Sequence, residues 1–449
     1  MRNLHFEKAI IRLQVVIIAI VVVAAAVAAG VYIIYFYPQG PVAPNIILIG
    51  VPAPLTGPGA QMGEPVPWIA SYIENAINKE GGIYLEEYGR KIPIKFLVRD
   101  VQFSLDLAST IAEELIVKDK VSLIMMPIGA TLYPAVAAKA EKYGVPCILH
   151  FCPSPMIPLM APSTYCYFTT WSWFEDILNI LEAGKLIKTN NILGVINSAG
   201  PIGEMARKLI GALAPKVGYE VVDLGLISPG LRDFSPYIER LKAAKAEVLY
   251  IGLEWEEGIT FWRQCHEMGY KPKVVYGTHI SADLRSILAL GGDLGLGLLG
   301  GGLFMREYPF RCSITGKTVK ELYEMYEKET GLMAGANMGA YAGFEIAVDV
   351  IKRAGSLNSD KILRAIANTN LNTTWGNINF KKPYPEELTK FYAEYEPELL
   401  TQMDHTAIMP TVVGQWFKED GRWVIKIVYV GRWKEVPVQA KIIPIPGSE

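Results

Sequence analysis

The residues of this chain that are able to do chemistry form no catalytic or metal-binding pattern. The sequence contains no GxxxxGK[ST] loop, no HExxH pair and no GxSxG elbow. A histidine without such a motif is ordinarily structural. Four histidines stand alone in this way: His150, His266, His279 and His405. No nucleophile can be matched to a base, so the sequence predicts a protein that is not an enzyme and that carries no metal and no cofactor.

Two glycine-rich stretches differ in what surrounds them. Gly295-Leu-Gly297-Leu-Leu-Gly300 spells GxGxxG, but it follows a helical stretch, whereas a dinucleotide site needs strand, glycines and helix in that order. We therefore expect it to be a flexible crossover between lobes. Pro54–Gly63 does have the right order, since it follows a strand-like run and precedes a helix. There the glycines allow a ligand to approach the backbone, and the helix N-terminus offers free N–H groups.

Alternating strand and helix patterns position this loop. The first set of strand-like runs is Ile46–Val51, Lys91–Arg99, Val121–Pro127 and Val145–Leu149, with helical patterns such as Val66–Lys79 between them. The alternation restarts at Asn191–Ile196 and continues to Val274–Tyr276. The pattern predicts an α/β fold with two lobes, each built on a doubly wound parallel sheet. Ligands in such folds bind beyond the carboxyl ends of the strands.

Composition supports a globular protein and excludes some partners. Of 449 residues, 51% are apolar and 20% charged, and the formal net charge is −2. This charge gives no reason to expect nucleic acid as a partner. Five cysteines are too few for a disulfide scaffold. Burial as free thiols is the favoured interpretation, and a Cys152–Cys166 or Cys147–Cys152 bridge is the alternative.

The N-terminal segment predicts a membrane anchor. From Leu13 to Tyr37 only Gln14 interrupts an apolar run whose helix would rise about 37 Å, enough to cross a hydrocarbon core of about 30 Å. Basic residues precede the run, and the first charge after it is Glu64. The positive-inside rule then places the N-terminus in the cytoplasm and the bulk of a single-pass protein outside the cell membrane, extracellular or periplasmic. A pilin-like signal cut near Lys8-Ala9, as on archaeal binding proteins, is the alternative.

Several motifs in order resemble one family. Pro54–Gly63 with Asn78-Lys79-Glu80-Gly81-Gly82-Ile83 is similar to the opening of the branched-chain amino-acid-binding family of type I periplasmic binding proteins. Asp233–Lys242 and Tyr250-Ile251-Gly252 resemble later motifs of that family. The resemblance implies two lobes joined by three hinge strands, closing on a ligand and docking to the permease subunits of an ABC transporter.

With this family in mind, we divide the chain into an anchor and two lobes. Residues 1–37 form the cytoplasmic N-terminus and transmembrane helix, and residues 38–45 a Pro/Gly linker. Residues 46–169 with 303–378 form the first lobe, and 170–302 with 405–437 the second. Residues 379–404 form a surface insertion.

The resemblance also suggests ligand-binding residues. In the first lobe these are Met62, the loop Gly129-Ala130-Thr131, and His150 and Ser154 after the fourth strand. In the second lobe they are Ile202, Glu254, Trp255, Thr278 and His279. The acidic residue that in the family takes the ligand's ammonium falls near Thr278-His279, and neither is acidic, which leaves Glu254 to carry that charge.

These observations predict the solute-binding component of an ABC importer. Its partners would be a small-molecule ligand, the permease subunits and, through the N-terminal helix, the membrane. The expected ligand is a branched-chain or other hydrophobic amino acid, or a related small molecule. An amide, a urea-like compound or an aromatic acid is the alternative ligand. A receptor ectodomain and a pilin-like surface assembly are the alternative functions.

Overall fold

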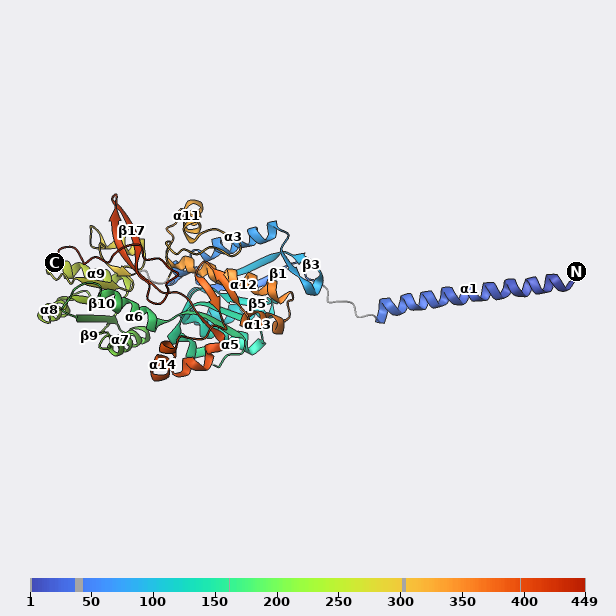
Figure 1. Cartoon of the computed structure of the whole chain (residues 1–449), viewed down its shortest axis with the longest axis horizontal. Helices are drawn as coiled ribbons and strands as arrows, with labels where there is room; N and C mark the ends of the chain where they lie inside the picture. The colour runs from blue at the N-terminus through green and yellow to red at the C-terminus, as the bar shows by residue number, and fades with distance from the viewer. Residues whose placement is uncertain (1, 37–42, 161, 301–303, 396, 449) are drawn as a thin grey trace.

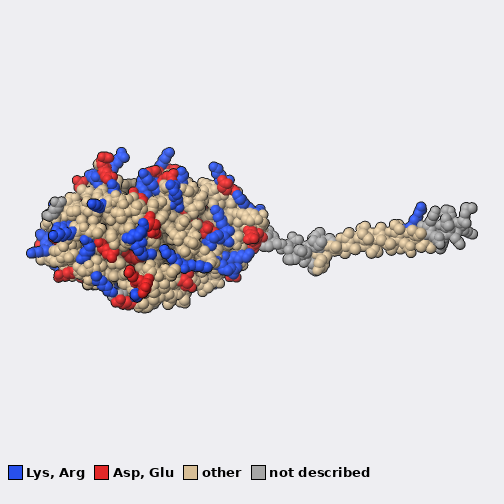
Figure 2. Space-filling model, viewed as in Figure 1, with Lys and Arg blue, Asp and Glu red and all other residues tan. Residues whose placement is uncertain are grey.

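The computed structural model of the chain describes residues 2–36, 43–160, 162–300, 304–395 and 397–448. A long N-terminal helix, α1 (Arg2–Phe36), stands apart from a two-lobed body (Figure 1). Its stretch Ile10–Ala29 has a mean hydropathy of 2.8 and buries nothing against the body. Within the described ranges, no other helix is long and apolar enough to cross a membrane. Charges of both signs cover the body, whereas most of α1 shows none (Figure 2).

The first lobe is built on a six-stranded parallel sheet in the order β15-β7-β6-β5-β1-β4. Its strands are β1 (Ile47–Ala53), β4 (Ile94–Asp100), β5 (Leu123–Met126), β6 (Cys147–Pro153), β7 (Cys166–Trp171) and β15 (Thr406–Ile408). Helices α3 (Val66–Lys79) and α12 (Ala340–Ala354) pack on one face, and α4 (Leu105–Val117) and α5 (Tyr133–Tyr143) on the other. Both faces are thus covered, and every residue of β5 and β6 is buried.

The second lobe is built on a seven-stranded sheet in the order β17-β16-β12-β11-β10-β8-β9. Its strands are β8 (Ile192–Ser198), β9 (Glu220–Ile227), β10 (Val248–Gly252), β11 (Val274–Gly277), β12 (Leu299–Gly300), β16 (Val413–Glu419) and β17 (Arg422–Tyr429). Only the pairs of β16 with β12 and with β17 are antiparallel. Helices α6 (Trp173–Gly184) and α7 (Pro201–Leu213) belong to one core, and α8 (Ser235–Ala243), α9 (Trp255–Glu267) and α10 (Leu284–Leu290) to the other.

Smaller elements complete the body. They are α2 (Ala60–Gly63), β2 (Ile83–Leu85), η1 (Glu86–Tyr88), β3 (Arg90–Ile92), η2 (Ala130–Leu132), η3 (Ser154–Met160), α11 (Val319–Thr330), η4 (Ala336–Gly339), α13 (Ser359–Ala367), β13 (Asn370–Thr373), β14 (Gly376–Asn379), α14 (Glu386–Tyr395) and η5 (Pro397–His405). Arg90 of β3 donates to the backbone carbonyls of Ala43 and Pro44 at 3.4 and 2.9 Å. The chain that follows the helix α1 is therefore held to the first lobe before β1 begins.

The chain passes between the two sheets after β7, after β12 and after β15. The second of these passages includes residues 301–303, which lie outside the described residues. One apolar core runs from α4 and α5 of the first lobe through α14 to α6 and α7 of the second. The lobes are therefore joined by packed side chains as well as by the chain itself.

Three sequence expectations need correction. Residues 405–437 do not all belong to the second lobe, because Thr406–Ile408 pairs with Phe168–Thr170 in the first sheet. Residues 379–404 are not a purely exposed insertion. Phe391 of α14 stacks on Phe174 with ring centroids 3.9 Å apart, and the Tyr392 and Ser172 hydroxyls lie 2.8 Å apart. Finally, the stretch Gly295–Gly300, expected to be a flexible crossover, ends in the strand β12. Gly300 is tightly packed there, since a Cβ at this position would lie 2.1 Å from Ser281 Oγ.

All five cysteines are buried as free thiols, as the sequence favoured. Because all of them are free, neither of the two bridges considered from the sequence is formed, and Cys147 lies opposite Cys166 across β6 and β7.

Candidate functional site

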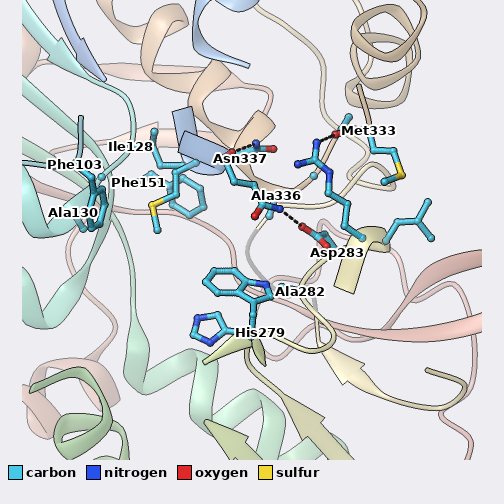
Figure 3. Close-up of a pocket in the computed structure, with 18 of the residues that line it drawn as sticks. Phe103, Ile128, Ala130, Phe151, His279, Ala282, Asp283, Met333, Ala336 and Asn337 are labelled. Atoms are coloured by element: carbon cyan, nitrogen blue, oxygen red, sulfur yellow. Dashed lines mark hydrogen bonds between the residues drawn. The ribbon is translucent and has the colours of Figure 1, made fainter. Parts of the chain in front are cut away.

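A cavity of about 340 Å³ lies between the two lobes, where strands of both sheets end (Figure 3). The first lobe lines it with residues that follow or end β1, β4, β5, β6 and β7, and with the segment 333–337. The second lobe lines it with residues that follow β10 and β11. This is the position at which open α/β sheets bind ligands. Figure 3 shows Phe103, Ile128, Ala130 and Phe151 on one side and Asp283 and Met333 on the other.

The loop after β1 is held in place by Asp100 at the end of β4. Its Oδ1 accepts hydrogen bonds from the backbone N–H groups of Leu55, Thr56 and Gln102 at 2.9, 3.1 and 2.9 Å. Burial opposes the charged form, but these bonds and one from the Thr56 hydroxyl outweigh it and lower the pKa of Asp100. The carboxylate therefore remains charged and fixes the start of the loop that leads to Gln61 and Met62.

Two phenylalanines reach the cavity from a left-handed backbone. Phe103, with φ of 55°, lies over Gly59, where a Cβ would approach its ring to 2.2 Å. Phe151, with φ of 62°, interrupts the pairing of β6 with β7 between Leu149 and Cys152. Non-glycine residues rarely adopt such angles, and both strain and bulges occur preferentially at functional sites.

A turn after β5 supplies the small residues of the cavity wall. Gly129 has φ of +107°, a conformation that favours glycine, and it precedes η2. The same turn brings Ala130 and Thr131 to the wall before α5 begins. These three residues have small side chains, so the backbone of Gly129-Ala130-Thr131 lies close to the cavity.

An aromatic pair forms the wall contributed by the second lobe. Trp255, at the start of α9, stacks on His279 with ring centroids 4.1 Å apart and an interplanar angle of 27°. His279 Nδ1 lies 2.9 Å from the carbonyl of Leu253, which fixes the imidazole with that nitrogen as the donor. Trp255 is 37% exposed, so the indole has a free face for a ligand.

Polar contacts join the lobes at the edge of the cavity. Arg285 Nη2 lies 2.6 Å from Glu64 Oε2 and also donates to the carbonyl of Met333 at 3.0 Å. Gln61 Nε2 lies 3.4 Å from Asp283 Oδ2, and Asn337 Nδ2 donates to the carbonyl of Gln61 at 2.7 Å. These contacts link α10 to the loop after β1 and to the segment 333–337. Among the described residues, no group of three or more His, Cys, Asp and Glu is placed to hold a metal ion.

The structure brings together six of the residues suggested by the sequence. Lining the cavity are Met62, Gly129, Ala130, Thr131, Trp255 and His279. The other five lie outside its wall, for reasons that differ between the lobes.

In the first lobe, His150 and Ser154 are buried, and their side chains form hydrogen bonds to other parts of the protein. His150 is completely buried, with Nδ1 2.5 Å from Thr169 Oγ1 and Nε2 2.9 Å from the carbonyl of Gly339. Burial lowers the pKa of His150 to about 4, so the ring is a neutral bridge between β6 and η4. Ser154 Oγ accepts a hydrogen bond from the backbone of Trp173 at 3.2 Å and ties η3 to α6.

In the second lobe, three suggested residues point elsewhere. Ile202 lies on α7 and is 45% exposed, away from the cavity. The Thr278 hydroxyl donates to the carbonyl of Ile251 at 2.8 Å. The side chain of Glu254 is 59% exposed and lies 3.9 Å from His279 Nδ1. Glu254 is therefore not the carboxylate that faces the cavity; the one that does is Asp283.

Several lining residues were not expected from the sequence. Phe103, Phe151, Asp283 and Asn337 are among them, and Trp171 also contributes. Asp283 could have been recognised in the sequence as a helix N-cap, because aspartate is preferred at that position. In the structure its side chain caps α10 by accepting a hydrogen bond from Ser286 N at 2.9 Å. For the phenylalanines and for the distant segment 333–337, the sequence carries no comparable signal.

Known proteins resemble this chain in sequence and in fold. The profile of the family described as "Periplasmic binding protein" matches residues 46–390. The "Leu/Ile/Val-binding protein homolog 3" of Brucella melitensis is 27% identical over 312 residues, covering 69% of this chain and 80% of its own length. A leucine-binding protein from Thermotoga maritima matches with a TM-score of 0.62 and 19% identity, covering 86% of this chain and 99% of that chain.

A solute-binding protein of an ABC transporter from Rhodopseudomonas palustris, solved with 3,4-dihydroxybenzoic acid, also matches, with a TM-score of 0.62 and 20% identity. It covers 90% of this chain and 100% of that chain. The matched proteins are solute-binding proteins and not enzymes.

Proposed function

Since the chain belongs to the periplasmic binding protein family, we propose that it is the solute-binding component of an ABC importer and that its ligand binds in the cavity between the lobes. Side chains from both lobes meet around this cavity, and this observation carries the proposal. A volume of about 340 Å³ suits an amino acid or a molecule of similar size.

The walls favour a ligand with an apolar body. Phe103, Phe151 and Trp255 present aromatic surface, and Met62 and Ile128 present aliphatic surface. A branched-chain or other hydrophobic amino acid fits this lining, in keeping with the names of the sequence relatives. An aromatic acid is a second candidate, because aromatic rings face the cavity from both lobes.

The location and partners follow from the helix α1 and from the family. We propose that α1 anchors the protein in the cell membrane with its N-terminus in the cytoplasm and both lobes outside. The apolar stretch Ile10–Ala29, which makes no buried contact with the body, supports this arrangement. The lobes would then release their ligand to permease subunits in the same membrane.

A thermal-unfolding screen tests the proposed function. The full chain in detergent micelles is unfolded with hydrophobic amino acids and hydroxybenzoic acids at millimolar concentration. A true ligand should raise the midpoint by several degrees, since binding at 100 times the Kd adds about 2.7 kcal/mol.

Two matched variants show whether a compound that raises the unfolding midpoint binds in the cavity. Thr131→Trp fills the cavity from an exposed position and should abolish the increase, whereas Thr110→Trp on the outer surface of α4 should keep it. A midpoint that no compound changes, or an increase that survives in Thr131→Trp, would exclude this function for the cavity.

A further inference from the structure

One sequence motif has no role in the cavity between the lobes. Asn372-Thr373-Thr374 is the one Asn-x-Ser/Thr triplet in the 449 residues. Such a triplet is the acceptor for the transfer of an oligosaccharide to asparagine in a chain that reaches the outside of the cell. Among the described residues that line the cavity, none belongs to this triplet. The places that the fold gives to its side chains decide whether it can be modified.

The fold exposes the asparagine of the triplet. Asn372 lies on β13, which forms a hairpin with β14 and places Asn372 directly opposite Asn377. The alternation of the two strands leaves Asn370, Asn372 and Asn377 exposed, whereas Thr373 and Ile378 are buried. Asparagine is depleted in strands, so strand propensity does not account for an outward face made of asparagines.

The amide of Asn372 is oriented with its nitrogen available. Asn377 Nδ2 donates to Asn372 Oδ1 and to Asn370 Oδ1, both at 2.9 Å. Because Oδ1 of Asn372 faces the neighbouring strand, its Nδ2 is directed away from that strand. An N-linked sugar is carried by this nitrogen and leaves the oxygen free to accept. A glycan on Asn372 is therefore compatible with the contacts between the asparagines.

The threonine of the triplet limits when the modification can take place. Thr374 is completely buried, and its hydroxyl donates to Glu345 Oε2 at 2.7 Å. The backbone N–H of Thr374 donates to the same oxygen at 2.9 Å. The acceptor triplet requires a hydroxyl at this position, and here it is out of reach once the hairpin has packed against α12. The sugar must then be added before the hairpin packs, while the exported chain is still folding.

The hairpin also separates the asparagines from the cavity. Trp375, in the turn between β13 and β14, is completely buried and lies edge-on to Phe151 with ring centroids 4.6 Å apart. Phe151 in turn lines the cavity. The turn thus points into the first lobe behind the cavity wall, whereas Asn372 faces solvent on the outer side of the strand. A glycan at Asn372 leaves the cavity open.

We infer that Asn372 is a site of N-linked glycosylation, with a lipid-linked oligosaccharide as the donor. In this reaction Asn372 Nδ2 forms a bond to the anomeric carbon of the sugar, and the bond between that carbon and the donor's phosphate oxygen breaks. The lipid phosphate leaves with the electron pair of that bond and takes up the proton that the amide loses. The inference rests on the proposed location of the lobes outside the cell and not on the identity of the ligand.

Mass spectrometry of the full chain, purified from the membranes of its native cells, tests the site. The peptide that contains Asn372 should be heavier than its sequence by at least one sugar residue. Asn372→Gln should lose this added mass. Asn370→Gln alters an exposed asparagine of the same strand that lies outside the triplet and should keep it, as should Thr374→Ser, which retains a hydroxyl. An unmodified Asn372 in the wild type, or added mass that survives in Asn372→Gln, would overturn the inference.

Protease added to spheroplasts, whose cell membrane is intact, separates this failure from a failure of the proposed location. If the lobes are digested and Asn372 is unmodified, the glycosylation site is refuted while the proposed location stands. If the lobes are protected and Asn372 is unmodified, both are refuted. Digestion of the lobes together with a modified Asn372 is the result that we expect.

Discussion

The ion pair between Arg285 and Glu64 should set how readily the two lobes stay closed. It joins α10 of the second lobe to the segment between α2 and α3 of the first, with a nitrogen–oxygen distance of 2.6 Å. The side chains are 30% and 23% exposed, so solvent screens the pair only in part. Hydrogen bonds to charged groups contribute about 1.5–3 kcal/mol, and we take the lower end to allow for screening. Loss of about 1.5 kcal/mol shifts the equilibrium roughly tenfold toward the open form.

We therefore expect Arg285→Gln to raise the apparent Kd of a ligand up to tenfold, because only the closed form surrounds it. Titration calorimetry of Arg285→Gln, Glu64→Gln and the double variant gives the coupling energy of the pair. The cycle is needed because Arg285 also donates to the carbonyl of Met333. Arg232 and Glu256, an ion pair within the second lobe with side chains 64% and 70% exposed, offer the control, and Arg232→Gln should bind normally. Additive effects of the two single substitutions, or a change in Kd below twofold for Arg285→Gln, would refute this account of closure.

Three further outcomes can be measured directly. Trp255→Ala should weaken binding roughly tenfold by calorimetry while the protein stays folded, because the indole is a half-exposed wall of the cavity. Asp176→Asn should raise the free energy of unfolding in urea by about 4 kcal/mol at pH 8 and by nothing below pH 4. Burial raises the pKa of Asp176 to about 7 in the folded state, so the wild type loses stability as the pH rises from about 4 to 7, and the amide does not. Deletion of residues 1–42 should move the protein from the membrane fraction to the soluble fraction with an unchanged unfolding midpoint, since Ile10–Ala29 buries nothing against the body.

Most of the fold could be predicted because its signals are local. The helix Val66–Lys79 has the predicted bounds, and the first strand differs by one or two residues at each end. The run Lys91–Arg99, read as one strand, is divided between β3 and β4 at Pro93, which has no N–H to donate to a ladder. The stretch 406–417 contributes to both sheets, since Thr406–Ile408 belongs to the first and Val413–Phe417 to the second. An apolar run carries no sign of where the chain passes from one sheet to another, and β16 begins only at Val413.

The residues of the site also fall into some that could be predicted from the sequence and others that could not. Gly129-Ala130-Thr131 could be placed because the family resemblance points to the loop after the third strand, and the end of that strand is readable in the sequence. Ile202 and Glu254 could not, because their exposure depends on how the second lobe turns toward the first. Phe103 and Phe151 were missed because phenylalanine gives no indication that its backbone will be left-handed.

The contact of Arg90 with the carbonyls of Ala43 and Pro44 has a consequence for how the protein meets its partners. It leaves six residues, 37–42, between the end of α1 and the pinned chain, a tether of at most about 20 Å. If α1 is held in the membrane, as we propose, both lobes would stay within reach of a permease diffusing in the same plane. Confinement to the same membrane would raise the concentration of the lobes around a permease compared with free diffusion outside the cell. Docking between the two proteins can then be weak, and the rate of transport would depend on their surface density rather than on the volume outside the cell.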